Sequence, residues 1–237
     1  MPVLRAPLSL VLASGSPQRR ALLERLGVPF TVRVSDAQEL EQGPDPAQVA
    51  VENARRKAWA VRRPGAPEAV LGCDTIVVLD GVIYGKPPDA AAARETLAAL
   101  GGRTHEVLSG LALLLADEQS GFVLRTAVAR TSVTFRAIEG ELLDWYVGTE
   151  EWRGRSGGYA IQGAGARLAL AVEGEEENVV GLPLAALLEL YPELPAQCKS
   201  FGRTGEQASQ SARLDRTGAP DERRESATPQ CDGVDRI

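Results

Sequence analysis

The sequence predicts a single α/β domain in which helices flank a twisted mixed sheet. Apolar residues make up 44% of the 237-residue chain, which is sufficient for a core of ordinary size. Short apolar runs alternate with segments of helical periodicity, as expected when parallel strands are joined by helices. Two long strand-like runs also follow each other through a polar turn, which indicates an antiparallel pair. We therefore expect a domain over residues 1–195 with both parallel and antiparallel strands.

The first half of the chain alternates apolar runs with helix signals. Gly27 provides a stop signal after the first helix, and a proline-interrupted loop precedes the second. The expected elements are strands over residues 8–13 and 30–35, helices over 17–26 and 48–61, a β-rich run over 70–79 that is broken by GCDT, and a hairpin around Asp80-Gly81.

The second half begins with a helix that Asp89 caps and that ends at Gly101 and Gly102. A glycine-rich segment, GRSGGYAIQGAGARLAL, lies between the later elements and ends in a strand near Glu173. The remaining expected elements are strands over residues 104–116 and 121–135, a helix over 138–147, and a loop that runs into a helix over 178–190.

The composition changes after Pro195. Residues 196–237 are polar, mixed in charge and nearly free of aliphatic clusters. Such a segment cannot bury enough apolar surface to offset the entropy lost on ordering, so we expect a disordered C-terminal tail.

Charge and composition exclude several classes of function. The formal net charge of −6 argues against nucleic-acid or anionic-membrane binding. The chain has three widely spaced cysteines and one histidine, His105, so neither a disulfide framework nor a His-based metal site or triad is indicated. The N-terminal apolar run is too short for a secretory signal and no later run has spanning length, so we expect a cytoplasmic protein.

The stretch VLASGSPQRRALLERLG has the features of a phosphate-binding helix start. Ser16 is placed as an N-cap and Pro17 as the first helical residue. Gly15 allows close backbone approach to a ligand, and Arg19 or Arg20 is available to clamp a phosphoryl oxygen. The stretch matches neither the P-loop nor the dinucleotide-binding pattern. The alternative is a well-made cap with solvent-facing arginines.

Asp74 interrupts an apolar run, where an unpaired charge would be costly. It is either hydrogen-bonded to backbone N–H groups in a strand break, or a metal ligand or general base. Lys86 lies between a glycine and two prolines, and Lys57 lies on a helix with two arginines; each is a ligand contact or a solvated charge. Glu39 has no local signal.

Gln162 is the one long polar side chain of the segment GGYAIQGAG. So many glycines indicate that backbone or ligand passes close by. The amide of Gln162 either reads the edge of a planar base or bonds to neighbouring backbone.

Taken in order, eight segments resemble the Maf family of nucleoside triphosphate pyrophosphatases over residues 8–192. They are LVLASGSPQRRALLERLG, ENARRKA, LGCDTIVVLDG, YGKP, GRTHEVLSGLAL, TSVTF, GGYAIQGAGA and NVVGLPL. The resemblance implies an ITPase-like domain with a nucleotide-binding cleft. It also implies hydrolysis between the α- and β-phosphates of a nucleoside triphosphate, giving the monophosphate and pyrophosphate.

The resemblance also assigns roles to residues. It implies phosphate binding by Ser14, Ser16 and Arg19, catalytic lysines at Lys57 and Lys86, and a proton acceptor at Asp74. Glu39 and Asp74 are the expected ligands of a divalent cation, Mg²⁺ or Mn²⁺, and a homodimer is expected. A net acidic chain needs such local cations to neutralise a triphosphate.

Substrate choice is implied by three positions. The branch of the family that acts on dTTP and UTP has an arginine where this chain has Gln18, whereas its threonine and glutamine are present as Thr75 and Gln162. A second branch, acting on methylated guanosine triphosphate, has tryptophan at the first position. Gln18 fits neither branch, and we expect a pyrimidine or modified nucleotide as substrate.

The sequence raises two functions other than nucleotide hydrolysis by this family. A non-catalytic nucleotide-binding regulator of septum formation is the main alternative, because the family is linked to division arrest as well as to keeping modified nucleotides out of nucleic acids. A haloacid-dehalogenase-type phosphatase is excluded, because its motif needs an aspartate where this chain has Ile76.

Overall fold

The computed structural model describes residues 8–117 and 121–194, which form a mixed seven-stranded sheet flanked by helices. The strand order is β2-β1-β3-β5-β6-β7, with β4 paired to β3. The pairs of β1 with β2 and with β3 are parallel, and the remaining pairs are antiparallel. The predicted α/β class is confirmed. The predicted tail over residues 196–237 lies outside the described residues.

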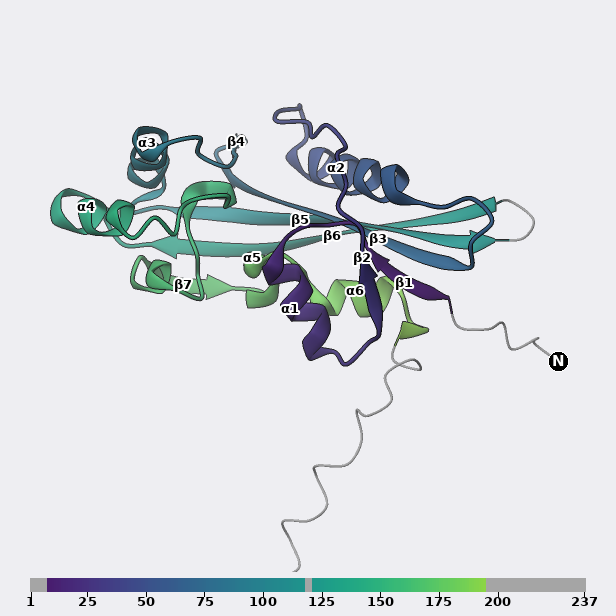
Figure 1. Cartoon of the computed structure of the whole chain (residues 1–237). Coiled ribbons are helices and arrows are strands. Elements are labelled where there is room, and N and C mark those ends of the chain that lie inside the picture. Colours follow the sequence, from purple (N-terminus) through teal and green to yellow (C-terminus); the bar gives the residue numbers. More distant parts are fainter. Residues whose placement is uncertain (1–7, 118–120, 195–237) are drawn as a thin grey trace, which may run out of the picture. The chain divides into compact units, whose positions relative to one another are not determined.

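The strands are β1 (Ser9–Leu12), β2 (Phe30–Val32), β3 (Glu68–Leu79), β4 (Val82–Tyr84), β5 (Thr104–Asp117), β6 (Gly121–Phe135) and β7 (Ala169–Glu173). The helices are α1 (Pro17–Arg25), α2 (Pro46–Val61), α3 (Ala90–Leu100), α4 (Gly140–Gly148), α5 (Glu176–Val180) and α6 (Leu184–Leu190), with 3₁₀ turns η1 (Ser156–Gly158) and η2 (Ala164–Arg167). Helix α2 covers one face of the sheet, and α1, α5 and α6 lie on the other (Figure 1). Over the described ranges, no helix has the length and hydropathy needed to cross a membrane.

Several predicted boundaries are confirmed by cap geometry. Ser16 accepts a hydrogen bond from the Arg19 amide, and Pro17 is the first residue of α1. Asp89 accepts from the Ala92 amide at 2.9 Å, and α3 ends at Leu100 before Gly101. In each case a polar side chain satisfies an amide that the first helical turn leaves free.

Other predicted boundaries were wrong. Strand β2 is shorter than expected, and α2 begins earlier, at Pro46, because Asp45 caps it through the Ala47 amide. Helix α4 starts at Gly140 rather than at 138, and part of the expected loop after residue 178 is the end of helix α5. These boundaries depend on local caps that the hydrophobic pattern does not reveal.

The expected break in the strand at Asp74 does not exist. Strand β3 pairs with β5 without interruption from Ala69 to Val78, and Asp74 lies opposite Gly110. The charged side chain is accommodated because it projects toward α2, where it has partners, while its backbone stays in the ladder.

One edge of β3 is left open between two short strands. β1 pairs with β3 only as far as Leu71, β4 pairs with it only from Val77, and β5 occupies the other edge. Residues 72–76 therefore have no strand partner on this edge. The gap lies at the carboxyl end of β1, which has parallel neighbours on both sides, and ligands of open α/β sheets bind at such points.

Two glycines allow α2 to pack directly on the sheet. A Cβ atom added at Gly72 would overlap the Ala54 carbonyl, and one added at Gly110 would overlap the backbone of Ala50 and Val51. Only the absence of these side chains lets α2 approach so closely, and polar residues of α2 thereby reach the open edge of β3.

We predict that Gly110→Ala lowers the free energy of unfolding by about 2 kcal/mol or more, because its Cβ meets backbone that cannot rotate away. Urea denaturation checks this value. Gly148→Ala is the control, since a Cβ there meets no atom within 4 Å and alanine favours helix. Equal stability of the two variants would contradict the packing argument.

Candidate active site

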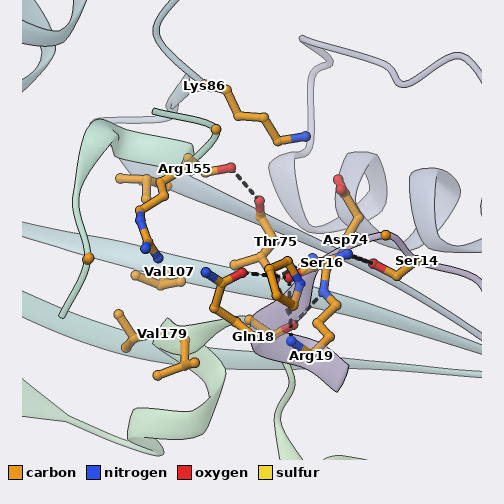
Figure 2. A pocket seen from close by; sticks show the side chains of 18 of the residues that line it. Ser14, Ser16, Gln18, Arg19, Asp74, Thr75, Lys86, Val107, Arg155 and Val179 are labelled. Carbon is orange, nitrogen blue, oxygen red and sulfur yellow. Dashed lines mark hydrogen bonds between the residues drawn. The ribbon is translucent and has the colours of Figure 1, made fainter. Parts of the chain in front are cut away.

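A cavity of about 490 Å³ opens at the gap beside β3. Its walls come from the β1–α1 loop, the centre of β3, the glycine-rich segment and the end of α5 (Figure 2). All ten residues predicted for the site line it: Ser14, Ser16, Gln18, Arg19, Glu39, Lys57, Asp74, Thr75, Lys86 and Gln162.

The cavity reaches both faces of the sheet, because consecutive residues of an open strand edge point to opposite sides. Asp74 points toward α2, where it forms an ionic wall with three other residues, Glu39, Lys57 and Lys86. Thr75 points to the other face, where an apolar wall is formed by four side chains, Val77, Val107, Tyr159 and Val179. One ligand can therefore meet charge on one side and apolar surface on the other.

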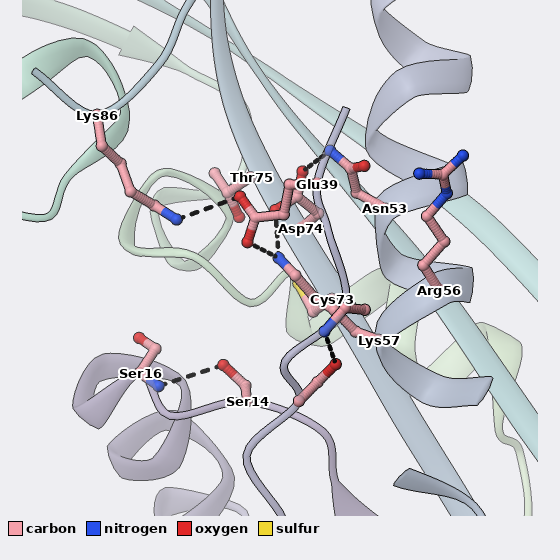
Figure 3. A network of polar contacts seen from close by, with 12 residues as sticks. Ser14, Ser16, Glu39, Asn53, Arg56, Lys57, Cys73, Asp74, Thr75 and Lys86 are labelled. Carbon is pink, nitrogen blue, oxygen red and sulfur yellow. Dashed lines mark hydrogen bonds and ion pairs between the residues drawn. The ribbon is translucent and has the colours of Figure 1, made fainter. Parts of the chain in front are cut away.

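Charges alternate along the ionic wall (Figure 3). The Nζ of Lys57 lies 2.6 Å from Asp74 Oδ1 and 2.8 Å from Glu39 Oε1. The Nζ of Lys86 lies 3.3 Å from Glu39 Oε2. Asp74 and Lys57 are only 4% and 8% exposed, so each supplies the counter-charge that the other needs in a buried position.

Asn53 is a site residue that the sequence reasoning missed. Its Nδ2 donates to Asp74 Oδ2 at 2.9 Å and to the Leu40 carbonyl at 3.0 Å, and its Oδ1 accepts from the Leu40 amide at 2.7 Å. It therefore holds both Asp74 and the loop that carries Glu39. The available signal was its position four residues before Lys57, which places both side chains on one face of α2.

The two lysines determine the charge state of Glu39. Partial burial of this carboxyl raises its pKa, but hydrogen bonds and charge from Lys57 and then Lys86 outweigh burial and hold the pKa below its usual value. Glu39 is therefore ionised at neutral pH and is available as an oxygen ligand.

The ionic wall suits a hard divalent cation that shares its coordination with a substrate. Glu39 and Asp74 present carboxylate oxygens, which Mg²⁺ and Mn²⁺ prefer. No group of three or more His, Cys, Asp or Glu side chains with metal-site geometry occurs among residues 8–117 and 121–194. Protein ligands alone would leave such a cation under-coordinated, so oxygens of a bound phosphate would have to complete its shell.

The β1–α1 loop presents a helix N-terminus to the cavity. Ser14 Oγ accepts from the Ser16 amide at 3.2 Å, and Gln18 Oε1 accepts from Ser16 Oγ at 3.0 Å. Arg20 points away from the cavity and pairs with Glu24 in solvent. The two candidate arginines are thus separated, and only Arg19 belongs to the site.

Arg19 is held at three points. Its Nε donates to the Gly181 carbonyl at 2.8 Å, its Nη1 to Ser14 Oγ at 3.2 Å and its Nη2 to Thr75 Oγ1 at 3.1 Å. Thr75 Oγ1 also lies 2.8 Å from Ser109 Oγ. The guanidinium therefore ties the helix start to β3 and to the end of α5.

The glycine-rich segment closes the far side of the cavity. Gly157 and Gly158 have φ values of 68° and 67°, and a Cβ at Gly157 would lie 2.7 Å from a methyl group of Val77. Close approach of a neighbouring chain segment, as predicted, is the reason for glycine here. Gln162, which is exposed, and Arg155, which the sequence reasoning missed, face the cavity from this segment.

His105 supports the apolar wall from behind. Its Nε2 lies 2.9 Å from the hydroxyl of Tyr159, and its ring packs edge-on against Phe135. Burial lowers the pKa of His105 to about 4 and raises the pKa of Tyr159, so both side chains stay neutral.

Comparison with known proteins identifies relatives of this chain. The family model described as "Maf-like protein" matches residues 9–194. A dTTP/UTP pyrophosphatase of Symbiobacterium thermophilum is 44% identical over 184 residues, which cover 76% of this chain and 91% of the relative. One from Deinococcus radiodurans is 43% identical over 191 residues, covering 80% and 94%. The solved Ham1 protein of Staphylococcus aureus is more distant, with 16% identity, a TM-score of 0.39, and coverage of 56% of this chain and 75% of that one.

We predict that His105 lowers the free energy of unfolding as the pH falls. The folded chain keeps His105 neutral down to about pH 4, whereas the unfolded chain binds a proton below about pH 6.5. Its contribution is complete above pH 6.5 and is lost as pH falls toward 4, a change of about 3 kcal/mol at most.

Urea denaturation at pH 7.5 and pH 4.5 measures this effect as the difference between the parent and His105→Gln. The variant should lose less stability than the parent over this interval, because carboxylates contribute equally to both proteins. Parallel losses in the two proteins would show that His105 does not titrate as described.

Proposed function

The chain belongs to the family of Maf-like proteins, and on that premise we propose that it hydrolyses dTTP and UTP to the nucleoside monophosphate and pyrophosphate. One observation carries the proposal. A carboxylate held between Asn53 and Lys57 lies in the same cavity as a helix N-terminus and two further cations, Arg19 and Lys86. Hydrolysis of a nucleoside triphosphate needs these features together: a proton acceptor for water, several cations for the phosphates and an apolar surface for the nucleobase.

The triphosphate is bound at the start of α1. The first amides of this helix and its dipole favour an anion, and Gly15 leaves the backbone accessible. The hydroxyls of Ser14 and Ser16 add hydrogen-bond donors, and Arg19 adds positive charge. Lys57 and Lys86 then neutralise the charge that grows on the leaving pyrophosphate.

Asp74 is the proton acceptor for the attacking water. Water attacks the α-phosphorus, the bond from that phosphorus to the oxygen bridging to the β-phosphate breaks, and the proton of the water passes to the Asp74 carboxylate. Asn53 and Lys57 hold this carboxylate at both oxygens, so it is oriented before the water binds.

Glu39 and Asp74 are the residues that would hold Mg²⁺ or Mn²⁺. The cation would polarise the phosphoryl oxygens and offset their charge. Lys57 contacts both carboxylates and Lys86 contacts Glu39, so the lysines hold the two acids together when no cation is bound.

The nucleobase of the substrate lies against the apolar wall. The proposed specificity residues there are Gln18, Thr75 and Gln162. The oxygen of Gln18 is engaged by Ser16, so its NH₂ group is the part left for a ligand. Thr75 also bonds to Ser109, which orients its hydroxyl. This arrangement supports a pyrimidine with hydrogen-bonding groups on its edge.

We propose that the protein is a cytoplasmic homodimer whose catalytic domain ends near residue 195. Its proposed cellular roles are the clearing of modified nucleotides and division arrest. A non-catalytic regulator is the alternative, but a mere binder has no need for a carboxylate held by two donors beside a phosphate seat.

We predict that Asp74→Asn lowers kcat for UTP and dTTP by about 100-fold or more, because the amide cannot take up a proton. Pyrophosphate and orthophosphate release from a panel of common and modified nucleotides, with Mg²⁺ or Mn²⁺ and with EDTA, provides the measurement. Asp144→Asn is the control, since Asp144 is exposed and lies outside the cavity. Near-normal turnover by a folded Asp74→Asn protein, or orthophosphate as the sole product, would refute the mechanism.

A further inference from the structure

Arg155 differs from the other cations of the cavity because its terminal nitrogens have no hydrogen-bond partner among the described residues. Arg19 donates through all three guanidinium nitrogens, and Lys57 and Lys86 contact the carboxylates of the ionic wall. Arg155 is anchored through Nε alone, which donates to the Glu151 carbonyl at 2.8 Å. Neither of its Nη groups has a partner within the part of the chain that the structure describes.

The backbone around Arg155 is fixed to the sheet. The hydroxyl of Ser156 donates to the Thr75 carbonyl at 2.7 Å, and the Gly157 amide donates to the Gly85 carbonyl at 3.0 Å. These contacts place Arg155 directly beside the open edge of β3. An arginine on a fixed backbone that is anchored at Nε loses little entropy when it binds a ligand.

The guanidinium of Arg155 extends toward the apolar wall. Figure 2 shows it directed to Val107 and away from Lys86. Burial raises the pKa of the Tyr146 hydroxyl to about 12, and the nearby charge of Arg155 opposes this rise. Arg155 therefore places its charge against the apolar wall and away from the two lysines.

We infer that Arg155 is a specificity-determining residue that donates hydrogen bonds to the 4-carbonyl oxygen of a uracil or thymine base lying against the apolar wall. This inference rests on the proposed function. A guanidinium is a donor only, so a ligand that displaces water from its Nη groups must present an acceptor to them. Uracil and thymine present a carbonyl oxygen at position 4, whereas cytosine presents an amino group, which the same donors repel.

Arg155→Met tests the inference because it keeps the apolar stem and removes the donors. We expect kcat/KM for UTP and dTTP to fall about 10-fold or more, chiefly through KM, while kcat/KM for CTP changes less than about 3-fold. Arg155→Lys should lie between the parent and the methionine variant. Arg153→Met is the matched control, since Arg153 is two residues away, pairs with Glu150, stacks on Trp152 and lies outside the cavity lining.

Two results would overturn the inference. Equal losses for all three nucleotides, together with weaker inhibition by inorganic triphosphate, would place Arg155 on the phosphates. Unchanged kinetics for every nucleotide would place it outside the complex. Thermal melts confirm folding of each variant.

Failure of the proposed function gives a different pattern. The parent would then release no pyrophosphate from any nucleotide, and calorimetric titration with UMP and CMP would replace kinetics. Preference for UMP that Arg155→Met abolishes would support the inference, and equal binding of UMP and CMP by the parent would refute it.

Discussion

The site depends on one buried carboxylate in the middle of a strand. Asp74 is almost inaccessible, and an unpaired charge there would cost several kcal/mol. Its counter-charge and its amide partner both come from α2, through Lys57 and Asn53. These contacts require α2 to lie against the backbone of the sheet, which Gly72 and Gly110 permit. The strand, the helix and the glycines between them therefore form one constraint, and the ionic wall is its consequence.

The early end of β1 makes this part of β3 accessible to a ligand. If β1 continued beside β3, residues 72–76 would be paired and Asp74 and Thr75 would face separate compartments. Because the edge is open, both sides of the strand reach one cavity. The Gly181 carbonyl organises the second side, where it accepts from Arg19 Nε at 2.8 Å and from Thr75 Oγ1 at 3.3 Å. Under the proposed function, Asp74 thus faces the phosphates and Thr75, its neighbour in the strand, faces the nucleobase.

The sequence predicts those features of the fold that depend on interactions between residues close together in the chain. The Ser16 cap, the Asp89 cap and the class of fold follow from side chains that act on their own helices or from hydrophobic periodicity. The continuity of β3 could not be predicted, because it depends on Asn53 and Lys57 approaching from another element. Glu39 illustrates the same limit, since its loop is held by Asn53 through Leu40 and its own neighbours carry no signal. Arg155 was missed because only the fold shows that its Nη groups lack partners among residues 8–117 and 121–194.

The two lysines of the ionic wall differ in burial, and therefore in how strongly they are held by their carboxylate partners. Lys57 is buried between two carboxylates at 2.6 and 2.8 Å, and removing either contact would leave a charge uncompensated. Lys86 is half exposed and 3.3 Å from Glu39, a contact of the kind that contributes little to stability. Under the proposed function, an arriving triphosphate would therefore draw Lys86 away from Glu39 more readily than it disturbs Lys57. That exchange would transfer a cation to the phosphates and free a carboxylate oxygen of Glu39 for a divalent ion, so Lys86 can serve a bound polyanion and still be ion-paired in its absence.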